Sequence, residues 1–569
     1  MEVVRSNASA VWGNASGGVI NVSSNTTFEQ PFVNLQSLFG SFGFRKQTIR
    51  AGAFLGNSRY FLSLSNTTSD GWRNHSASSQ FLVNTGLVSQ VGERTNVGIF
   101  LTGTSNVFRI PGPLTQAQYD SLPEQSDSVF IKRDDRRVNR LGRLGATVSH
   151  EFNDANSIAA SIYASPKSLQ RSERNRYRDF NRYHVGGNAT FKNSSALSST
   201  MLNTILVGVD EAYQDGSILF YNLTANGDRS TTLRANKREG ANNFGIFLQN
   251  ESVIGEEFSV SLGGRYDNIT YYYDDYITPV LNDRKSFERF TPKVGLTYRF
   301  SPTHSVYANL GGGVEVPAGN EVDPSPTFGD DTIRAINPLL EPITSATIEA
   351  GTKHILPLGD EGSLGTLMYD AAIYWIEVRN DIIPYSGGAF YFTAGKTNRI
   401  GAEFGGTIQF TNGLSLGTAI TLSSNKYAEY TIDSVHYGKP GASSNLKDNK
   451  TPGVPDVFYT IDVRYAPPLL KGIYAKATLR SVGSYFADDR NMFEVPSYST
   501  LDLTLGLDRM KVTESGLVLS GFVTVNNATN KKYVASAWIN PDLVAGNPVY
   551  IEPGLPRNVV GGLTVGWEF

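Results

Sequence analysis

Two arginine-rich stretches are the part of this sequence whose residue types could do chemistry. The first stretch contains Arg171, Arg174, Arg176, Arg178 and Arg182, with Tyr177, Phe180 and Tyr183 among them. The second contains Lys132, Arg133, Arg136, Arg137, Arg140 and Arg143. Guanidinium groups make bidentate contacts with carboxylates and phosphates, and they stack on aromatic faces. The two stretches therefore predict a surface for an anionic ligand. The alternatives are contact with membrane phosphates, or loop charges that are simply solvated.

A group of tyrosines and three acidic pairs are the other candidate binding groups. The tyrosines are Tyr271, Tyr272, Tyr273 and Tyr276. They predict either a structural belt of aromatic side chains or a surface on which a ligand stacks. The acidic pairs are Asp274–Asp275, Asp330–Asp331 and Asp488–Asp489. Since they lack the 12-residue spacing of a calcium-binding loop, they do not predict a calcium site.

The sequence contains no recognisable catalytic or metal-binding motif. The six histidines are scattered, and neither an HExxH motif, a GxSxG motif nor a P-loop is present. There are no cysteines, which excludes disulfides, thiolate metal sites and cysteine nucleophiles. We therefore expect no catalytic, cofactor-binding or metal-binding residues, and a protein that is not an enzyme.

The elements that would position these side chains are strands, as the C-terminal segment makes clearest. Phe569, Trp567, Val565, Leu563 and Val559 fall on one face, while the other face is small or polar. Successive strand side chains point to opposite sides, so this segment has one apolar face and one wet face. A terminal aromatic residue on such a strand is typical of a barrel in the bacterial outer membrane.

The connections between strand-like segments alternate between short turns and long polar stretches. Short turns are predicted near residues 56–58, 92–94, 153–156, 255–256, 301–303 and 411–413. Long loops are predicted near 106–138, 167–182, 214–241, 271–288, 314–343, 379–397, 426–453, 485–497 and 528–557. Outer-membrane barrels have short periplasmic turns and long outer loops. The pattern predicts an all-β, transmembrane, antiparallel up-and-down barrel of about 22 strands.

Composition agrees with this interpretation and limits the partners. The 569 residues carry 50 Lys and Arg against 53 Asp and Glu, which gives no reason to expect nucleic-acid binding. The sequence has no run of about 18 apolar residues, so it predicts no transmembrane helix. Glycine (56), tyrosine (28) and phenylalanine (31) are plentiful, as strands, tight turns and interfacial girdles require.

Several segments resemble the TonB-dependent receptor family, the energised outer-membrane importers of siderophores and other scarce nutrients. The first resembles the end of the family's plug domain and contains Glu2, Arg5, Gly13, Gly17, Gly18 and Asn21. Segments 110–119, 337–342, 394–397, 525–533 and 553–557 resemble family motifs in the family's order. The chain also departs from the pattern, with Trp12 in place of the usual tyrosine and Ala528 in place of an aromatic residue.

The resemblance implies two parts of unequal size. Residues 1–27 would be the C-terminal remnant of the plug domain, and residues 28–569 the barrel with its long extracellular loops. The family has a full plug, a TonB-contacting motif and a signal peptide before this point. We therefore expect the sequence to be truncated at its N-terminus.

By this resemblance, the protein would be an importer in the outer membrane of a Gram-negative bacterium. Its loops and plug would capture a scarce nutrient, and the resemblance favours a ferric siderophore over another chelate or a vitamin. Expected partners are that ligand, outer-membrane lipid and lipopolysaccharide, and the TonB complex through the missing segment; we expect a monomer. The alternatives are a passive channel or surface-binding barrel, a non-functional fragment, and a soluble β-sandwich adhesin.

Overall fold

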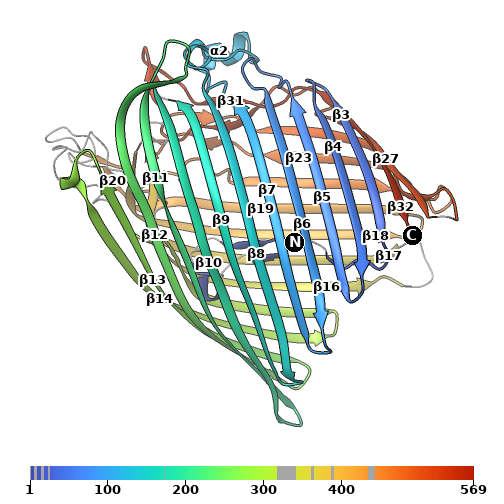
Figure 1. Ribbon diagram of the computed structural model, residues 1–569. Coiled ribbons are helices and arrows are strands. Elements are labelled where there is room, and N and C mark those ends of the chain that lie inside the picture. Colours follow the sequence, from blue (N-terminus) through green and yellow to red (C-terminus); the bar gives the residue numbers. More distant parts are fainter. Residues whose placement is uncertain are drawn as a thin grey trace.

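The protein is a closed β-barrel, shown from the side in Figure 1 as a computed structural model. The structure describes residues 2–4, 9–13, 18–22, 26–173, 175–316, 341–359, 364–385, 390–432, 443–514 and 516–569. Within these residues, 22 antiparallel strands make up the barrel. The predicted all-β fold and the predicted number of strands are therefore confirmed.

Strands that follow one another around the barrel wall are hydrogen-bonded neighbours. The wall strands are β3 Phe32–Gly40, β4 Arg45–Leu55, β5 Ser58–Ser69, β6 Ser78–Val91, β7 Thr95–Arg109, β8 Arg136–Asn153, β9 Asn156–Glu173, β10 Arg176–Ser198, β11 Met201–Leu223, β12 Arg229–Ile254, β13 Phe258–Asp275, β14 Asp283–Ser301, β15 His304–Glu315, β16 Ile343–Pro357, β17 Leu364–Tyr385, β18 Phe390–Phe410, β19 Leu414–Glu429, β22 Val457–Tyr465, β23 Ile473–Val482, β26 Tyr498–Lys511, β27 Leu517–Asn526 and β32 Asn558–Glu568. The first and last wall strands pair directly, with Phe32 opposite Glu568. Since this pairing closes the sheet, neither end strand is left with an open edge.

The remaining elements are short. The small strands are β1 Glu2–Val4, β2 Val19–Asn21, β20 Thr431–Ile432, β21 Ser444–Asn445, β24 Tyr485–Phe486, β25 Glu494–Val495, β28 Val534–Ala537, β29 Leu543–Val544, β30 Asn547–Pro548 and β31 Ile551–Pro553. The helices are α1 Ser9–Trp12, α2 Gln116–Ser121, α3 Ser128–Lys132 and the 3-10 helix η1 Pro279–Leu281. Among the described residues, no helix has both the length and the hydropathy needed to cross a membrane.

Side chains alternate between an apolar outer face and a polar lumenal face along each wall strand. Ile162 is 68% exposed on the outer face of β9, and Leu563 is 53% exposed on that of β32. Asp370 of β17 and Asp502 of β26 lie on the lumenal face, in alternation with exposed Ile373 and Leu503. The apolar side chains therefore face hydrocarbon, and the charged ones face a wet lumen.

The connections differ at the two ends of the barrel. At one end, tight turns join β4 to β5 and β6 to β7, with Gly56 and Gly92 at positive φ angles of 60° and 69°. Residues with a Cβ atom rarely adopt positive φ angles, so glycine suits these turns. At the other end lie the long loops, including residues 110–135 and 527–557. The predicted alternation of short and long connections is therefore confirmed.

Four of the predicted loops are largely strand hairpins. Residues 167–173 belong to β9 and 176–182 to β10, which pair as far as Glu173 opposite Arg176, and most of 214–241 belongs to β11 and β12. Most of 271–288 belongs to β13 and β14, and residues 379–385 and 390–397 belong to β17 and β18. In these segments, polar and apolar side chains are mixed on both faces, as at Ile218, Leu219 and Phe220 of β11. The amphipathic alternation that marks a membrane strand is absent there, which explains the wrong prediction.

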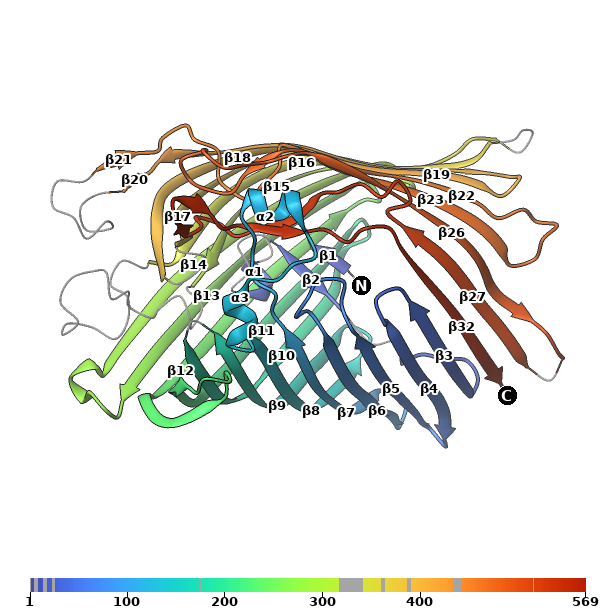
Figure 2. The same cartoon turned by 90° about the horizontal axis from the view of Figure 1, so that it is seen from above.

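The N-terminal segment lies inside the barrel. β1 pairs with β2, with Glu2 opposite Asn21. α1 contacts β12, β13, β14 and β15 of the wall. Viewed along the barrel, these three elements lie within the ring of wall strands (Figure 2). The lumen is therefore partly occupied by residues that precede the wall in sequence.

Candidate functional site

A row of arginines crosses the lumenal face of the wall near the long-loop end. Arg137 of β8, Arg171 of β9 and Arg178 of β10 stand directly opposite one another on successive strands. Glu173 contacts all three, with N–O distances of 3.9 Å to Arg137, 2.9 Å to Arg171 and 3.6 Å to Arg178. One carboxylate is thus shared by three guanidinium groups.

A second group of charges lies on the same face, beyond Arg178 along β10. Arg182 of β10 contacts Glu239 of β12 at 2.7 Å, and Lys237 contacts the same carboxylate at 2.6 Å. The Lys237 side chain is only 5% exposed. We call the five cations Arg137, Arg171, Arg178, Arg182 and Lys237, with Glu173 and Glu239, the arginine wall.

Two phenylalanine rings pack against four of these cations. Arg171 and Arg182 lie over the Phe180 ring, 5.7 and 5.8 Å from its centroid. Arg178 lies 5.0 Å and Lys237 5.4 Å from the centroid of Phe220. Guanidinium groups are attracted to aromatic faces, and a stacked side chain has fewer rotamers left to lose when a ligand binds. The arginine wall is therefore preorganised for planar oxyanions such as carboxylates.

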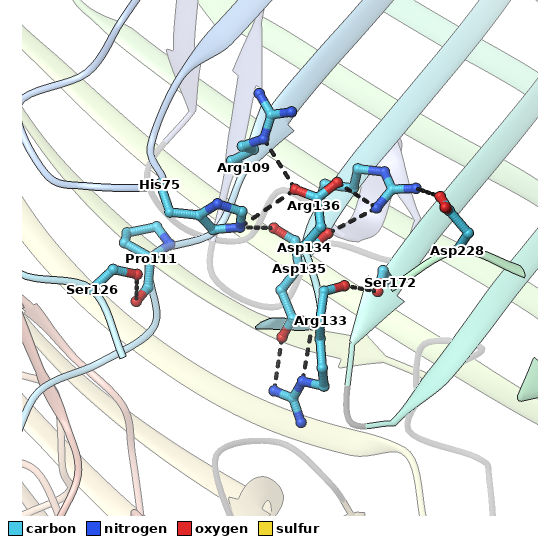
Figure 3. A network of polar contacts seen from close by, with 10 residues as sticks. All are labelled: His75, Arg109, Pro111, Ser126, Arg133, Asp134, Asp135, Arg136, Ser172 and Asp228. Carbon is cyan, nitrogen blue, oxygen red and sulfur yellow. Dashed lines mark hydrogen bonds and ion pairs between the residues drawn. The ribbon is translucent and has the colours of Figure 1, made fainter. Parts of the chain in front are cut away.

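The predicted residues Arg133 and Arg136 belong to a different structure, a polar network on the rim (Figure 3). Arg133 makes two hydrogen bonds to Asp135, at 3.2 and 2.8 Å. Arg136 contacts Asp134 at 2.7 Å and Asp228 at 3.2 Å. These contacts tie the β7–β8 loop to the β11–β12 turn. The two arginines thus have their own carboxylates, and their contacts are structural.

Asp135 is the buried centre of this network. It is 0% exposed, its backbone oxygen lies 3.1 Å from His75 Nε2, and it accepts a hydrogen bond from the backbone of Ile110. Burial raises the pKa of Asp135 to about 6, although Arg133 acts in the opposite direction. Burial likewise lowers the pKa of His75. The network therefore joins three segments at the mouth of the barrel.

The long loops also pack on one another across the mouth. Leu114 of the β7–β8 loop is fully buried and exchanges backbone hydrogen bonds with Ile551 of β31, at 2.8 and 3.0 Å. Other buried side chains of this cluster are Tyr119, Ala487, Val495, Val534 and Tyr550. Segment 110–119, which resembles a family loop, thus holds the last long loop in place beside the lumen.

The other predicted residues lie on different faces of the wall. Tyr271 is buried on the lumenal face of β13, whereas Tyr272 lies on the outer face, because neighbouring strand residues alternate. Tyr177 lies on the outer face of β10, while Arg176 lies on the lumenal face, 6.0 Å from the Phe220 centroid. Arg174 lies outside the described residues. Of the first basic stretch, Arg171, Arg178 and Arg182 thus belong to the arginine wall, and Arg176 lies beside it.

An outer-face cluster near Tyr272 was missed by the sequence reasoning. Asp215 accepts two hydrogen bonds from Arg238, at 2.8 and 2.6 Å, and one each from Tyr183 and Tyr213. Tyr272 donates to the Tyr213 hydroxyl at 2.9 Å. The residues come from four neighbouring strands, β10 to β13. Only the strand register brings them together, so composition gave no signal.

The lumenal N-terminal segment is fixed to the wall by a buried arginine. Arg265 of β13 is 3% exposed and contacts Asp210 at 2.6 Å and Asp267 at 2.7 Å. Its Nη1 also lies 3.4 Å from the Val11 carbonyl oxygen of α1. Gly245 makes this reach possible, because a Cβ atom there would lie 1.7 Å from Arg265 Nη2. Arg265 therefore connects the wall to the segment inside it.

Of the predicted plug residues, Gly13 lies at this contact. Gly13 has a φ angle of 74°, and a Cβ atom there would lie 2.9 Å from Arg265 Nη2. Gly18 also has positive φ, and Asn21 ends β2. Arg5 and Gly17 lie outside the described residues, as do residues 337–340 of the family-like segment 337–342.

Comparisons with known proteins agree with this architecture. A family model described as TonB dependent receptor-like, beta-barrel, matches residues 68–528. The ferrioxamine receptor of Yersinia enterocolitica is 28% identical over 333 residues, which cover 57% of this chain and 39% of that receptor. The ferrichrome outer membrane transporter/phage receptor of Escherichia coli K12 is 23% identical over 299 residues, covering 52% and 35%. The chain thus matches about two fifths or less of these relatives' lengths.

Solved structures share the fold. The unliganded ferric citrate transporter FecA has a TM-score of 0.81 at 17% identity, with 99% of this chain and 83% of that chain covered. The siderophore receptor PiuA from Acinetobacter baumannii has a TM-score of 0.79 at 16% identity, with 100% and 86% covered. At these identities the similarity establishes the architecture alone.

The closed barrel with short turns at one end, long loops at the other and a chain segment inside the lumen defines a large outer-membrane barrel of a Gram-negative bacterium. Because the family model covers most of the sequence, the chain belongs to the TonB-dependent receptor-like β-barrel family. The relatives in this family are receptors and transporters. The long-loop end is accordingly the extracellular end.

Proposed function

We propose that this protein imports a ferric siderophore across the outer membrane, with energy supplied through TonB. The observation that supports the proposal is a row of cations packed on aromatic rings, on the lumenal side of the barrel mouth. A ligand held there lies at the entrance to the transport path rather than on the outer surface. The curated relatives, named as ferrioxamine and ferrichrome receptors or transporters, support iron as the cargo.

The proposed sequence of events follows from the positions of these parts. The packed extracellular loops and the arginine wall capture the chelate at the mouth. Residues 1–27, which we propose to be part of the plug, then move away from the wall when the protein is energised. Below them, a lumenal cavity of about 1190 Å³ is lined by polar side chains, including Lys293, Glu349, Lys353 and Asp462. Such a lining suits passage of a hydrated chelate.

Growth rescue tests the proposal. The gene, as its genome encodes it, is expressed in an iron-starved host that lacks its own ferric siderophore receptors. A panel of ferric chelates is then supplied to cells with and without TonB. We expect at least one chelate to restore growth only when TonB is present. Equal rescue without TonB would indicate a passive channel, and no rescue by any chelate would contradict import of ferric siderophores.

Protein purified from the same cells tests the proposed oligomeric state. We propose that the protein works as a monomer and that its outer face contacts lipid and lipopolysaccharide. A purified oligomer in detergent, measured by light scattering, would contradict the first of these proposals.

A further inference from the structure

We propose that His304 and His354 form a binding site for one divalent transition-metal ion, of the zinc, nickel and copper class, on the outer face of the barrel at its short-turn end. This site goes beyond the proposed import function, because it lies on the opposite side of the wall from the lumen. The ion bound there belongs to the wall and is distinct from any iron cargo.

The strand register brings together two of the six histidines of the chain. His304 is the first residue of β15, and it stands directly opposite His354 of β16. Side chains that stand opposite one another on antiparallel strands have Cβ atoms about 5 Å apart. The two imidazole rings lie face to face, with their centroids 4.2 Å apart and their planes 17° from parallel.

This separation matches what one metal ion requires of two imidazoles. An ion of this class binds an imidazole nitrogen at about 2.0–2.1 Å, so two nitrogens on one tetrahedral ion lie about 3.3 Å apart. Rotation of the two side chains is enough to place one nitrogen of each ring on a common ion. The strands need not move, since their pairing already holds the rings at this distance.

The hydrogen bonds of the two rings use one nitrogen of each. The Thr352 hydroxyl donates to the Ser305 carbonyl oxygen at 3.0 Å and therefore accepts from His304 Nε2 at 3.3 Å. The proton on Nε2 leaves the lone pair on Nδ1 of this ring. His354 uses Nδ1, which lies 3.2 Å from the Tyr369 hydroxyl. Metal-binding histidines are oriented by such a bond at the second nitrogen, which leaves His304 Nδ1 and His354 Nε2 for the ion.

The pair lies on the outer face, at the edge of the apolar band. His304 is on the same face of β15 as Leu310, and His354 is on the same face of β16 as Ile348; these two apolar side chains are 52% and 51% exposed. The short turn of residues 301–303 directly precedes His304. An ion in the water beneath the membrane can therefore reach the rings.

The nearest lysine in sequence does not oppose a cation at this site. Lys353 directly precedes His354 but lies on the lumenal face, with its Nζ 6.0 Å from the centroid of the Tyr307 ring. Neighbouring strand residues alternate between faces, so the wall separates this charge from the histidine pair.

The ligands on the page define the class of the ion. Among the described residues, no group of three or more His, Cys, Asp or Glu side chains could hold a metal. Two imidazoles are therefore the protein ligands here, and water completes the coordination. Imidazole suits zinc, nickel and copper, whereas calcium and magnesium prefer oxygen ligands. Copper(II) binds such ligands most tightly of the divalent first-row ions, so it is the most sensitive probe.

The alternative role for the two rings is to extend a belt of aromatic side chains. Phe300 lies 5.0 Å from His304 and Tyr369 lies 5.4 Å from His354, measured between ring centroids. A belt at the membrane edge requires flat rings but no nitrogen lone pairs. Phenylalanine keeps the ring and removes both nitrogens, so substitution by phenylalanine separates the two roles.

The test is titration of the purified full-length protein in detergent, without a histidine tag, with copper(II) and separately with zinc. Calorimetry counts the bound ions, and electron paramagnetic resonance counts the nitrogens on copper. We expect one tightly bound ion per chain, with two imidazole nitrogens on the copper. The bound ion should also raise the unfolding temperature, because it binds the folded pair alone.

Variants locate the ion. His304→Phe and His354→Phe should each weaken copper binding about tenfold or more, since even loss of a ligand's hydrogen-bond partner costs about 10–100-fold in affinity. The matched control is His150→Phe. His150 lies on the outer face of β8 near its short-turn end and packs 4.8 Å from Phe152, but Thr95 stands opposite it. We expect the control to change copper binding by less than about twofold, because its site is independent of the pair.

The outcomes decide the inference without deciding the import function. Absence of saturable copper and zinc binding would overturn it, as would copper binding that is unchanged in both phenylalanine variants of the pair. Equal weakening in His150→Phe would show that no particular pair holds the ion. Growth rescue by ferric chelates does not depend on these side chains, so any of these failures leaves import as it stands. Heat-modifiable migration in gel electrophoresis verifies that each variant is folded.

Discussion

At the scale of single residues, the arginines of this chain have two kinds of surroundings. Arg133, Arg136 and Arg265 each have their own carboxylates and join segments of the structure. Arg171 and Arg178 share one carboxylate and lie on the lumen. Sequence composition could predict the basic stretches but could not separate these roles, because strand register and loop folding decide which acid each arginine meets.

The contact between Arg265 and the N-terminal segment gives a prediction about that segment. Ala10 of α1 is 1% exposed, and the natural chain has no cysteine, so Ala10→Cys introduces a single thiol. We expect this thiol to react slowly with a maleimide. Adding Arg265→Gln should raise the reaction rate at least tenfold, because the Val11 contact and both carboxylate pairs are lost. An unchanged rate would mean that Arg265 does not hold the segment.

Asp135 gives a prediction about pH. Its pKa in the folded protein is about 6, above the usual value near 3.9, so the folded loop prefers the protonated carboxyl. The stabilisation is complete below the usual pKa and is lost as the pH rises through about 6. We expect the β7–β8 loop to be more resistant to trypsin at pH 5 than at pH 8. The change in opening free energy from this group is at most about 3 kcal/mol.

The control for this measurement is Asp135→Asn, which removes the titration. His75 acts in the opposite sense, because its lowered pKa means that protonation at low pH opposes folding. The difference between the natural protein and the variant therefore isolates Asp135. Cleavage near Lys132, located by mass spectrometry, should depend less on pH in the variant. Equal pH dependence in both proteins would contradict a raised pKa for Asp135.

At the scale of elements, the alternation of side chains was enough to predict the strands that cross the membrane. The C-terminal strand shows why, since Leu563 and Trp567 of β32 are 53% and 43% exposed on the apolar face. The alternation of side chains did not predict the parts of the strands that extend beyond the membrane. On the β9–β10 and β11–β12 hairpins, outward positions hold Tyr183, Asp215 and Arg238, so no apolar face identifies them as strands. Their pairing became visible only in the structure.

The two faces of β9 give a matched pair of substitutions. Ile162→Lys places a charge on the lipid face, and we expect it to reduce the free energy of unfolding by about 2–4 kcal/mol, as for a lysine near the bilayer midplane. Ala159→Lys lies three residues away on the lumenal face, where water solvates the charge, and should change stability by less than about 1 kcal/mol. Urea-induced unfolding in lipid vesicles measures both. Equal losses would contradict the assignment of the faces.

At the scale of the whole molecule, pairing of the first and last wall strands closes the 22 strands around one lumen. β3 and β32 meet, the extracellular loops pack around Leu114, and the arginine wall lies on the lumenal side of the mouth. Sequence reasoning predicted the barrel, the family and the basic residues. It did not predict that Arg137 and Arg182, 45 positions apart, belong to one surface, because two hairpins must form before they lie on the same wall.

The most direct measurement is the position of iron in crystals of the protein grown with an anionic ferric chelate. Iron scatters anomalously, so its site is found without assuming the ligand's pose. The account predicts one strong iron peak in the barrel mouth, within one chelate radius of the guanidinium groups of Arg171 and Arg178. An iron peak on the outer face, or one in the lumen far from these side chains, would contradict it.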